Sequence, residues 1–219
     1  MKTTRFLFAT ACAATLALLG GCITPPSNPD PIAYRPHNPA NVRVKVSLST
    51  QQVYVLEGNR PLLVAATCVG VPGKSRTPTG DFTVNFKDAR KRSMSYGFYI
   101  NGDTIYAADA GKGTGRYVGH PMPYWVEFTP AYGFHEGFVW PIPHTHGCLR
   151  LHKNVAAKFF ALVRVGTPVN IAQSQPEDLT IGLNVPRPVD YNEPEQDARI
   201  LCNDALAFPG ATGPLLIEQ

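Results

Sequence analysis

Alternation of apolar and polar residues dominates the chain from residue 41 onward. A period of two predicts a half-buried β-strand over residues 42–48, where the apolar positions are Val42, Val44, Val46 and Leu48. Residues 52–57 and 62–71 predict two further strands, since Gly58 and Asn59 between them are typical of a turn. The alternation resumes at Phe82, Val84 and Phe86.

The pattern weakens between residues 87 and 120, where Gly, Ser and Asp are frequent and apolar runs are short. We expect a long loop region there, with short strands at 98–100 and 104–108. Because long loops in compact domains are often functional, this region is expected to form a lid or one wall of a cleft.

Regular elements return after residue 120. Strands are expected at 124–128 and 132–134, and a last strand at 167–172. Asn154 is expected to cap a short helix over residues 155–163. The pattern therefore predicts a mainly β domain with one or two short helices.

Prolines mark both ends of this domain. Residues 23–40 contain six prolines, which is incompatible with a regular helix or a central strand and predicts an extended tether at 22–40. Residues 173–219 form a second proline-rich stretch, with a short helix expected at 198–207. The sequence thus divides into a tether, a folded domain at 41–172 and a C-terminal extension of unassigned role.

Charge excludes several classes of protein. Charged residues make up 16% of the 219 residues and the net charge is +4, so the chain is not a disordered polyelectrolyte. The one basic cluster is interpreted as a solvated loop that would help to hold an anionic polymer; it comprises Lys87, Arg90, Lys91 and Arg92. No aromatic-interleaved basic face accompanies it, so no nucleic acid partner is expected.

Candidate chemistry concentrates in residues 145–151, which read Thr-His-Gly-Cys-Leu-Arg-Leu. Cys148 follows His146 and Gly147, and His135 lies thirteen residues upstream of the cysteine. A thiol performs acyl transfer as its thiolate, and it needs a nearby base and oxyanion donors. Gly147 lets the backbone approach a substrate closely, so the Gly147 and Cys148 amides are candidate oxyanion donors. His135 or His146 is the candidate base.

Two structural interpretations compete with this one. The cysteine is alternatively a buried core thiol, or half of a zinc site. Zinc binding by His135, His144, His146 and Cys148 would block the nucleophile, and the chain contains no Cys-x-x-Cys pair. We therefore expect neither a metal nor a cofactor.

The segments around His135 and Cys148, together with three stretches upstream, resemble the signature of the L,D-transpeptidase (YkuD-like) family. That signature is a histidine, a short spacer, and Ser or Thr followed by His-Gly-Cys, matched here by His135 and residues 145–151. Three further stretches are similar to the family's opening hairpin, its Thr-Pro-x-Gly-x-Phe turn and its Met-Pro-Tyr segment: residues 44–56, 77–82 and 122–125. The resemblance spans about residues 42–172 and implies a mixed-sheet β-sandwich.

The resemblance also implies roles for individual residues. His135 is expected to be the base, because the family places its catalytic histidine upstream. His146 is the alternative base and otherwise orients substrate or shapes the oxyanion pocket. Thr145 is expected to fix the His135 tautomer through its hydroxyl or its carbonyl. Arg150 is expected either to pair with the diaminopimelate carboxylate or to fasten the loop in a salt bridge. Tyr124 and Trp125 are expected to line the substrate cleft, with core packing as their alternative.

The implied reaction is acyl transfer on peptidoglycan stem peptides. Cys148 would attack the carbonyl between an L-centre and a D-residue, release the terminal D-amino acid and pass the acyl group from a thioester to an amine. The sequence leaves three acceptors open: another stem peptide, a free D-amino acid, or a lysine of an anchored lipoprotein. It also leaves two alternative functions, an L,D-carboxypeptidase or other hydrolase on the same scaffold and a non-catalytic wall-binding lipoprotein.

The N-terminus is identified as a lipoprotein-type signal peptide over residues 1–21. It has a positively charged start, an apolar run too short to span a membrane, and Leu-Gly-Gly before Cys22, which resembles a bacterial lipoprotein cleavage box. Cys22 is the expected lipidation site, and Ile23 in place of Asp favours the outer membrane. We therefore expect a periplasm-facing lipoprotein. Of the other cysteines, Cys68 and Cys202 are left as a candidate disulfide or as separate thiols.

Overall fold

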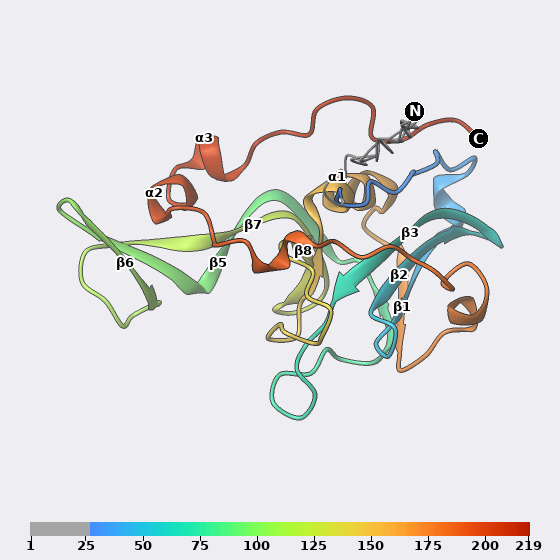
Figure 1. Cartoon of the computed structure of the whole chain (residues 1–219), viewed down its shortest axis with the longest axis horizontal. Helices are drawn as coiled ribbons and strands as arrows, with labels where there is room; N and C mark the ends of the chain where they lie inside the picture. Colours follow the sequence, from blue (N-terminus) through green and yellow to red (C-terminus); the bar gives the residue numbers. More distant parts are fainter. Residues whose placement is uncertain (1–26) are drawn as a thin grey trace, which may run out of the picture.

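A computed structural model describes residues 27–219 (Figure 1). Their ten strands form one mixed sheet in the order β4-β10-β1-β2-β3-β9-β8-β7-β5-β6. The strands are β1 (Val42–Ser47), β2 (Gln52–Glu57), β3 (Arg60–Cys68), β4 (Gly80–Thr83), β5 (Phe86–Asn101), β6 (Thr104–Asp109), β7 (Arg116–Thr129), β8 (Tyr132–Glu136), β9 (Leu149–Leu151) and β10 (Pro168–Ala172). The helices are α1 (Lys153–Leu162), α2 (Ala198–Leu201) and α3 (Asp204–Ala207), with 3-10 turns η1 (Pro39–Asn41), η2 (Pro176–Leu179) and η3 (Asp190–Asn192).

The first three strands form an antiparallel meander, as the alternation predicts. Val42, Val44 and Val46 are each at most 1% exposed, whereas the residues between them are half-buried. Val44 pairs with Val55 of β2 on one side and, in parallel, with Val169 of β10 on the other. Central strands flanked on both sides keep their apolar face in the core, which is why the period-two pattern was informative here.

The sheet folds back on itself and brings its two halves face to face. β4 lies at one end of the strand order and β7 near the other, yet the rings of Phe82 in β4 and Phe128 in β7 are 5.1 Å apart between centroids. Buried residues of both halves and of α1 form one apolar core. The expectation of a mainly β, mixed-sheet β-sandwich is confirmed.

Helix α1 begins two residues earlier than expected and has a different cap. Asn154 was expected to cap it, but the side chain of His152 does so, with Nδ1 accepting from the Asn154 amide at 3.3 Å. Phe159 packs on Phe134 of β8 with 4.5 Å between ring centroids. At the other end, Lys87 Nζ donates to the carbonyls of Phe160 and Val163, both at 2.6 Å, and satisfies groups that a helix C-terminus leaves free.

Residues 87–120 are not the long loop that the sequence suggested. β5, β6 and the first half of β7 form an antiparallel wing, which projects to the left in Figure 1. Both faces of β6 and of much of β5 are partly exposed, so neither strand alternates between apolar and polar residues and no period-two signal is left. Strands β5 and β7 are nevertheless closely paired. They approach so closely at Gly119 that a Cβ there would lie 1.9 Å from the Ser93 carbonyl oxygen.

The C-terminal extension, residues 173–219, packs back on the domain as a strap. It runs across the outside of β2 and β3, reaches the wing through α2 and α3, and returns to the N-terminal segment (Figure 1). Four contacts mark its course, which are Lys45 Nζ to Glu177 (2.7 Å), Gln52 Nε2 to the Gly182 carbonyl (2.9 Å), His152 Nε2 to Asp190 Oδ2 (3.0 Å) and the Ile217 amide to the Ala33 carbonyl (2.9 Å).

The basic cluster of β5 holds this strap, so its interpretation as a solvated loop is wrong for its arginines. Arg92 donates to Asp204 at 2.6 Å and to the Leu201 carbonyl at 3.0 Å. Arg90 and Arg92 both lie over the ring of Phe208, at 5.3 and 5.0 Å. These cation–π and charge-assisted contacts fix α2 and α3 on the wing.

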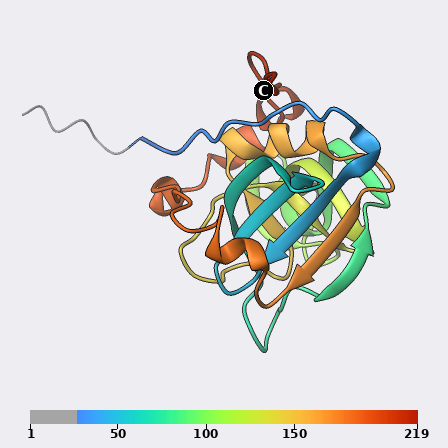
Figure 2. The same ribbon diagram turned by 90° about the vertical axis from the view of Figure 1, so that its right-hand side faces the viewer.

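The N-terminal segment is extended as expected, but its described part does not act as a free tether. Residues 28–35 lie along α1 (Figure 2), where Asn154 Nδ2 donates to the Pro29 carbonyl at 3.1 Å and Ala33 is 2% exposed. The predicted signal peptide and Cys22 lie outside the described residues. Within residues 27–219, no helix combines the length and the apolar character needed to cross a membrane.

Candidate active site

Strands β7, β8 and β9 have two chemically different faces. Phe134 of β8 pairs with Leu149 of β9, and both are fully buried toward α1. Successive residues of a strand point to opposite faces. His135 and Arg150, which pair directly, therefore project from the other face, and the same alternation places Cys148, the residue just before β9, on that face. The structure thus brings together three residues that the sequence motif named.

The loop that carries Cys148, residues 145–148 (the cysteine loop), is held close to the turn that follows β3. A Cβ on Gly70 would lie 2.8 Å from the Gly147 Cα, and a Cβ on Gly147 would lie 2.5 Å from the Tyr132 ring. Gly147 also has φ +113°, which favours glycine. Only glycine fits at both positions, and their backbone contact fixes the approach of Cys148 to β8. The Cys148 Sγ lies 3.8 Å from the Ala131 carbonyl oxygen.

Thr145 shapes this loop and does not orient His135, which corrects the expectation. Its hydroxyl donates to the Cys148 carbonyl at 2.6 Å and accepts from the Gly147 amide at 3.1 Å, while its carbonyl accepts from Val71. The Gly147 amide is therefore engaged inside the loop. It is not available as an oxyanion donor, so that expected role passes to the Cys148 amide.

The tautomer of His135 is set by its own strand. Its Nδ1 lies 2.7 Å from the carbonyl oxygen of Glu136. A carbonyl oxygen only accepts hydrogen bonds, so Nδ1 carries the proton. Nε2 is then left with a lone pair, which is the form that a general base requires.

Burial sets the resting protonation of the cysteine and histidine. It lowers the pKa of His135 to about 3, with the positive charge of Arg150 acting in the same direction. Burial also raises the pKa of the Cys148 thiol, and Arg150 opposes that rise. At neutral pH the resting site therefore holds a thiol and a neutral imidazole, and not a thiolate–imidazolium pair.

Arg150 is available for a ligand. Its aliphatic stem lies against Gly137, where an added Cβ would lie 3.0 Å from Arg150 Cδ. No side-chain carboxylate of residues 27–219 lies within 4.0 Å of its guanidinium, so the alternative of a loop-fastening salt bridge has no support in the described chain. Its positive charge lies close enough to lower the pKa of both the Cys148 thiol and the His135 imidazole.

Tyr124 does not line the cleft, which corrects a second expectation. Its ring packs on Phe160 of α1 at 5.8 Å between centroids, on the core side of the sheet. The neighbouring Trp125 points the other way and lies 6.0 Å from the His135 ring, almost directly across from it on β7. Tyr124 and Trp125 differ by one position, and strand alternation decides which one meets the site.

Two aromatic contacts near the motif were not foreseen from the sequence. His146 is exposed and its ring stacks on Tyr96 of the wing at 5.1 Å, so it joins the cysteine loop to that element. His144 stacks on Trp140 at 4.2 Å, and Trp140 also packs on Tyr191 of the strap. The contacts with Tyr96 and Tyr191 join segments far apart in sequence, so no local pattern predicts them.

The remaining cysteines and possible metal ligands were also located. Cys68 and Cys202 are free thiols, so the candidate disulfide is not formed. Cys68 pairs with Arg150 across β3 and β9 and is fully buried. Over residues 27–219, no group of three or more His, Cys, Asp or Glu side chains is arranged to hold a metal ion.

Comparison with known proteins gives the family. A sequence profile of the L,D-transpeptidase catalytic domain (YkuD) matches residues 41–171. Among solved structures, an L,D-transpeptidase from Stackebrandtia nassauensis is 19% identical with a TM-score of 0.45, covering 66% of this chain and 60% of its own. One from Mycobacterium smegmatis is 19% identical with a TM-score of 0.46, covering 60% of this chain and 58% of its own.

The catalytic domain of an E. faecium L,D-transpeptidase is 23% identical with a TM-score of 0.42, covering 63% of this chain and 100% of its own. A comparison with curated proteins found no match. The profile match extends from the start of β1 to the end of β10 and includes both His135 and Cys148. The chain therefore belongs to the L,D-transpeptidase catalytic domain (YkuD) family.

Proposed function

We propose that this protein is a peptidoglycan L,D-transpeptidase that works through a thioester on Cys148. One observation carries the proposal. His135 in β8 and Cys148, the residue just before β9, lie on the same face of the sheet by strand alternation, and the Glu136 carbonyl leaves the Nε2 lone pair of His135 free. A nucleophile beside a correctly oriented base is the arrangement that covalent acyl transfer needs.

In the first half-reaction, His135 Nε2 accepts the thiol proton as Cys148 Sγ bonds to the carbonyl carbon between the L-centre and the D-residue. The Cys148 amide is the candidate donor to the oxyanion that develops. When the C–N bond breaks, the leaving D-amino acid takes the proton from His135. Because the pKa of His135 is low, its imidazolium is a strong acid and gives up this proton readily.

In the second half-reaction, an amine attacks the thioester and His135 accepts a proton from it. The thiolate leaves and is reprotonated, so the enzyme returns to its neutral resting pair. Arg150 is proposed to bind a carboxylate of the stem peptide, because its guanidinium has no acidic partner in residues 27–219. It also lies close enough to Cys148 and His135 for its charge to lower the pKa of both.

Product masses test the proposal directly. The protein is incubated with a tetrapeptide stem and an amine acceptor, and the products are separated by mass spectrometry. A cross-linked or amine-exchanged peptide supports a transpeptidase. A tripeptide with no adduct at saturating acceptor would instead assign the carboxypeptidase activity, and no Cys148 adduct with a carbapenem would indicate a wall-binding protein.

We also propose that Cys22 is lipidated and places the enzyme on the periplasmic side of the outer membrane. The support is the Leu-Gly-Gly sequence before Cys22, after a charged start and a short apolar run. Two or more acyl chains give stable anchoring where one does not. The intact mass of the mature N-terminus is decisive, because a free N-terminus at another residue would indicate an ordinary secretory signal.

A further inference from the structure

The N-terminal segment leaves the domain at a fixed point. The Val189 amide of the strap donates to Asn28 Oδ1 at 2.9 Å, and Lys158 Nζ donates to the Pro31 carbonyl at 2.8 Å. Further along, the Arg35 amide donates to the Ile217 carbonyl at 2.8 Å. With contacts to α1, to the middle of the strap and to its C-terminal end, this segment cannot swing freely. Any anchor attached upstream of Asn28 pulls on one defined face of the protein.

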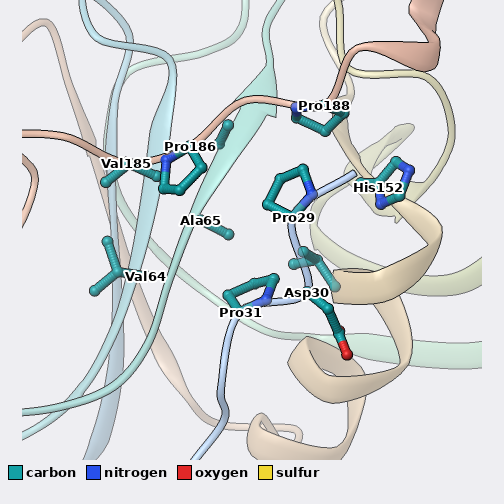
Figure 3. Close-up of a pocket in the computed structure, with 11 residues that line it drawn as sticks. Pro29, Asp30, Pro31, Val64, Ala65, His152, Val185, Pro186 and Pro188 are labelled. Atoms are coloured by element: carbon teal, nitrogen blue, oxygen red, sulfur yellow. The ribbon is translucent and has the colours of Figure 1, made fainter. Parts of the chain in front are cut away.

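An apolar cavity of about 300 Å³ lies at this exit point (Figure 3). The N-terminal segment, β3, the first turn of α1 and the strap all contribute to its wall. Proline and aliphatic side chains dominate the lining, among them Pro29, Pro31, Val64, Pro186 and Pro188. Prolines have no amide hydrogen, so this wall presents few hydrogen-bond donors.

Exposed aliphatic residues continue this apolar surface along the strap. A second hollow shares Val64 with the cavity and is bordered by Ile181 and Leu183, which are 39% and 56% exposed. Leu179 is 78% exposed, and Val189, which is bonded to Asn28, is 49% exposed. A contiguous exposed apolar surface on a soluble domain marks an interaction site.

We propose that this surface, formed by the N-terminal segment and strap residues 179–189, docks onto a lipid bilayer. The inference rests on the proposed lipidation of Cys22. Asn28 lies six positions after Cys22, and a chain spans at most about 3.5 Å per residue, so the exit point lies within about 20 Å of an acylated Cys22. The apolar surface beside the exit point then faces the acyl-chain region. Leu183 and its neighbours enter the interface, and the catalytic domain takes one orientation on the membrane.

Tryptophan substitutions test the docking. Leu183→Trp and Val165→Trp are compared in the acylated protein on vesicles of phosphatidylethanolamine and phosphatidylglycerol with brominated acyl chains. Val165 is 58% exposed, so it matches Leu183, but it follows the far end of α1, about 15 Å along the helix from the cavity. Emission at position 183 should shift to the blue and be quenched severalfold more than at position 165. The signal of the native tryptophans, Trp125 and Trp140, is subtracted using the unsubstituted protein.

Three results would overturn the proposal. Equal quenching at both positions would show no preferred face. A blue shift of Leu183→Trp that appears without vesicles and grows with protein concentration would assign the surface to a second copy of the chain. An intact mass lacking acyl groups on Cys22 would remove the anchor. Loss of carbapenem acylation, in contrast, bears only on the proposed reaction, because Cys148 and His135 do not contribute to this surface.

Discussion

Neighbouring residues of strands β7, β8 and β9 point to opposite faces of the sheet, and the two faces have different roles. Phe134 and Leu149 face α1 and are fully buried. His135 and Cys148, their immediate neighbours, face the opposite side by strand alternation, and they are the proposed base and nucleophile. The same short strands therefore contribute to the core on one face and to the proposed active site on the other, and each substitution in them should affect one property more than the other.

The largest expected effect is on catalysis from Cys148→Ala. Loss of a nucleophile removes several orders of magnitude in rate, while removal of a half-buried sulfur on the outer face leaves the core intact. The measurement is carbapenem acylation by mass, alongside urea unfolding. Cys68→Ala is the control, since it removes a buried thiol from the same face of the sheet. Acylation that persists in Cys148→Ala and disappears in Cys68→Ala would reverse the assignment.

His135→Ala should lower the acylation rate by about 10²–10⁴-fold, the usual contribution of a general base. His146→Ala should have a much smaller effect, because His146 is exposed and stacks on Tyr96 of the wing. Stopped-flow acylation rates of the two variants give the comparison. A larger defect in His146→Ala would transfer the base role to that histidine.

On the other face, Phe134→Ala should lower the free energy of unfolding by about 3–5 kcal/mol, since it opens a cavity beside Phe128 and Phe159. His135→Ala should destabilise the protein less, because its ring is on the outer face. Urea denaturation of both variants measures the difference. Similar losses of stability would show that the two faces are not separable.

Arg150→Gln should produce the smallest effect, a shift in the pH profile. Arg150 lowers the pKa of His135, so its removal raises that pKa. Only neutral His135 acts as a base, and the acid limb of the acylation rate should therefore move to higher pH than in the wild type. Arg150→Lys keeps the charge and should leave the limb near its original position. An unchanged limb in Arg150→Gln would mean that burial alone sets the pKa.

The wing and the strap show where reading the sequence fails. The strand at 42–48 was predictable because its apolar residues alternate on one buried face, and the strand at 52–57 because it is a short apolar run that ends at turn residues. β5 and β6 are longer or equally long, but both faces of each are partly exposed over most of their length, so their apolar and polar residues do not alternate. Arg92 appeared as part of a solvated cluster because its partners, Leu201 and Asp204, lie more than a hundred positions away.

The sequence by itself determined the local features: the alternating strands, the glycine that the cysteine loop requires, and the spacing of His135 and Cys148 that identifies the family. Only the tertiary structure decided that Thr145 serves the loop and not the histidine, that Trp125 and not Tyr124 meets the site, and that residues 28–35 are fixed to the domain. The physical reason is the same in each case. Local patterns fix which face a side chain takes, but its neighbours across that face depend on strand register and on contacts between distant segments.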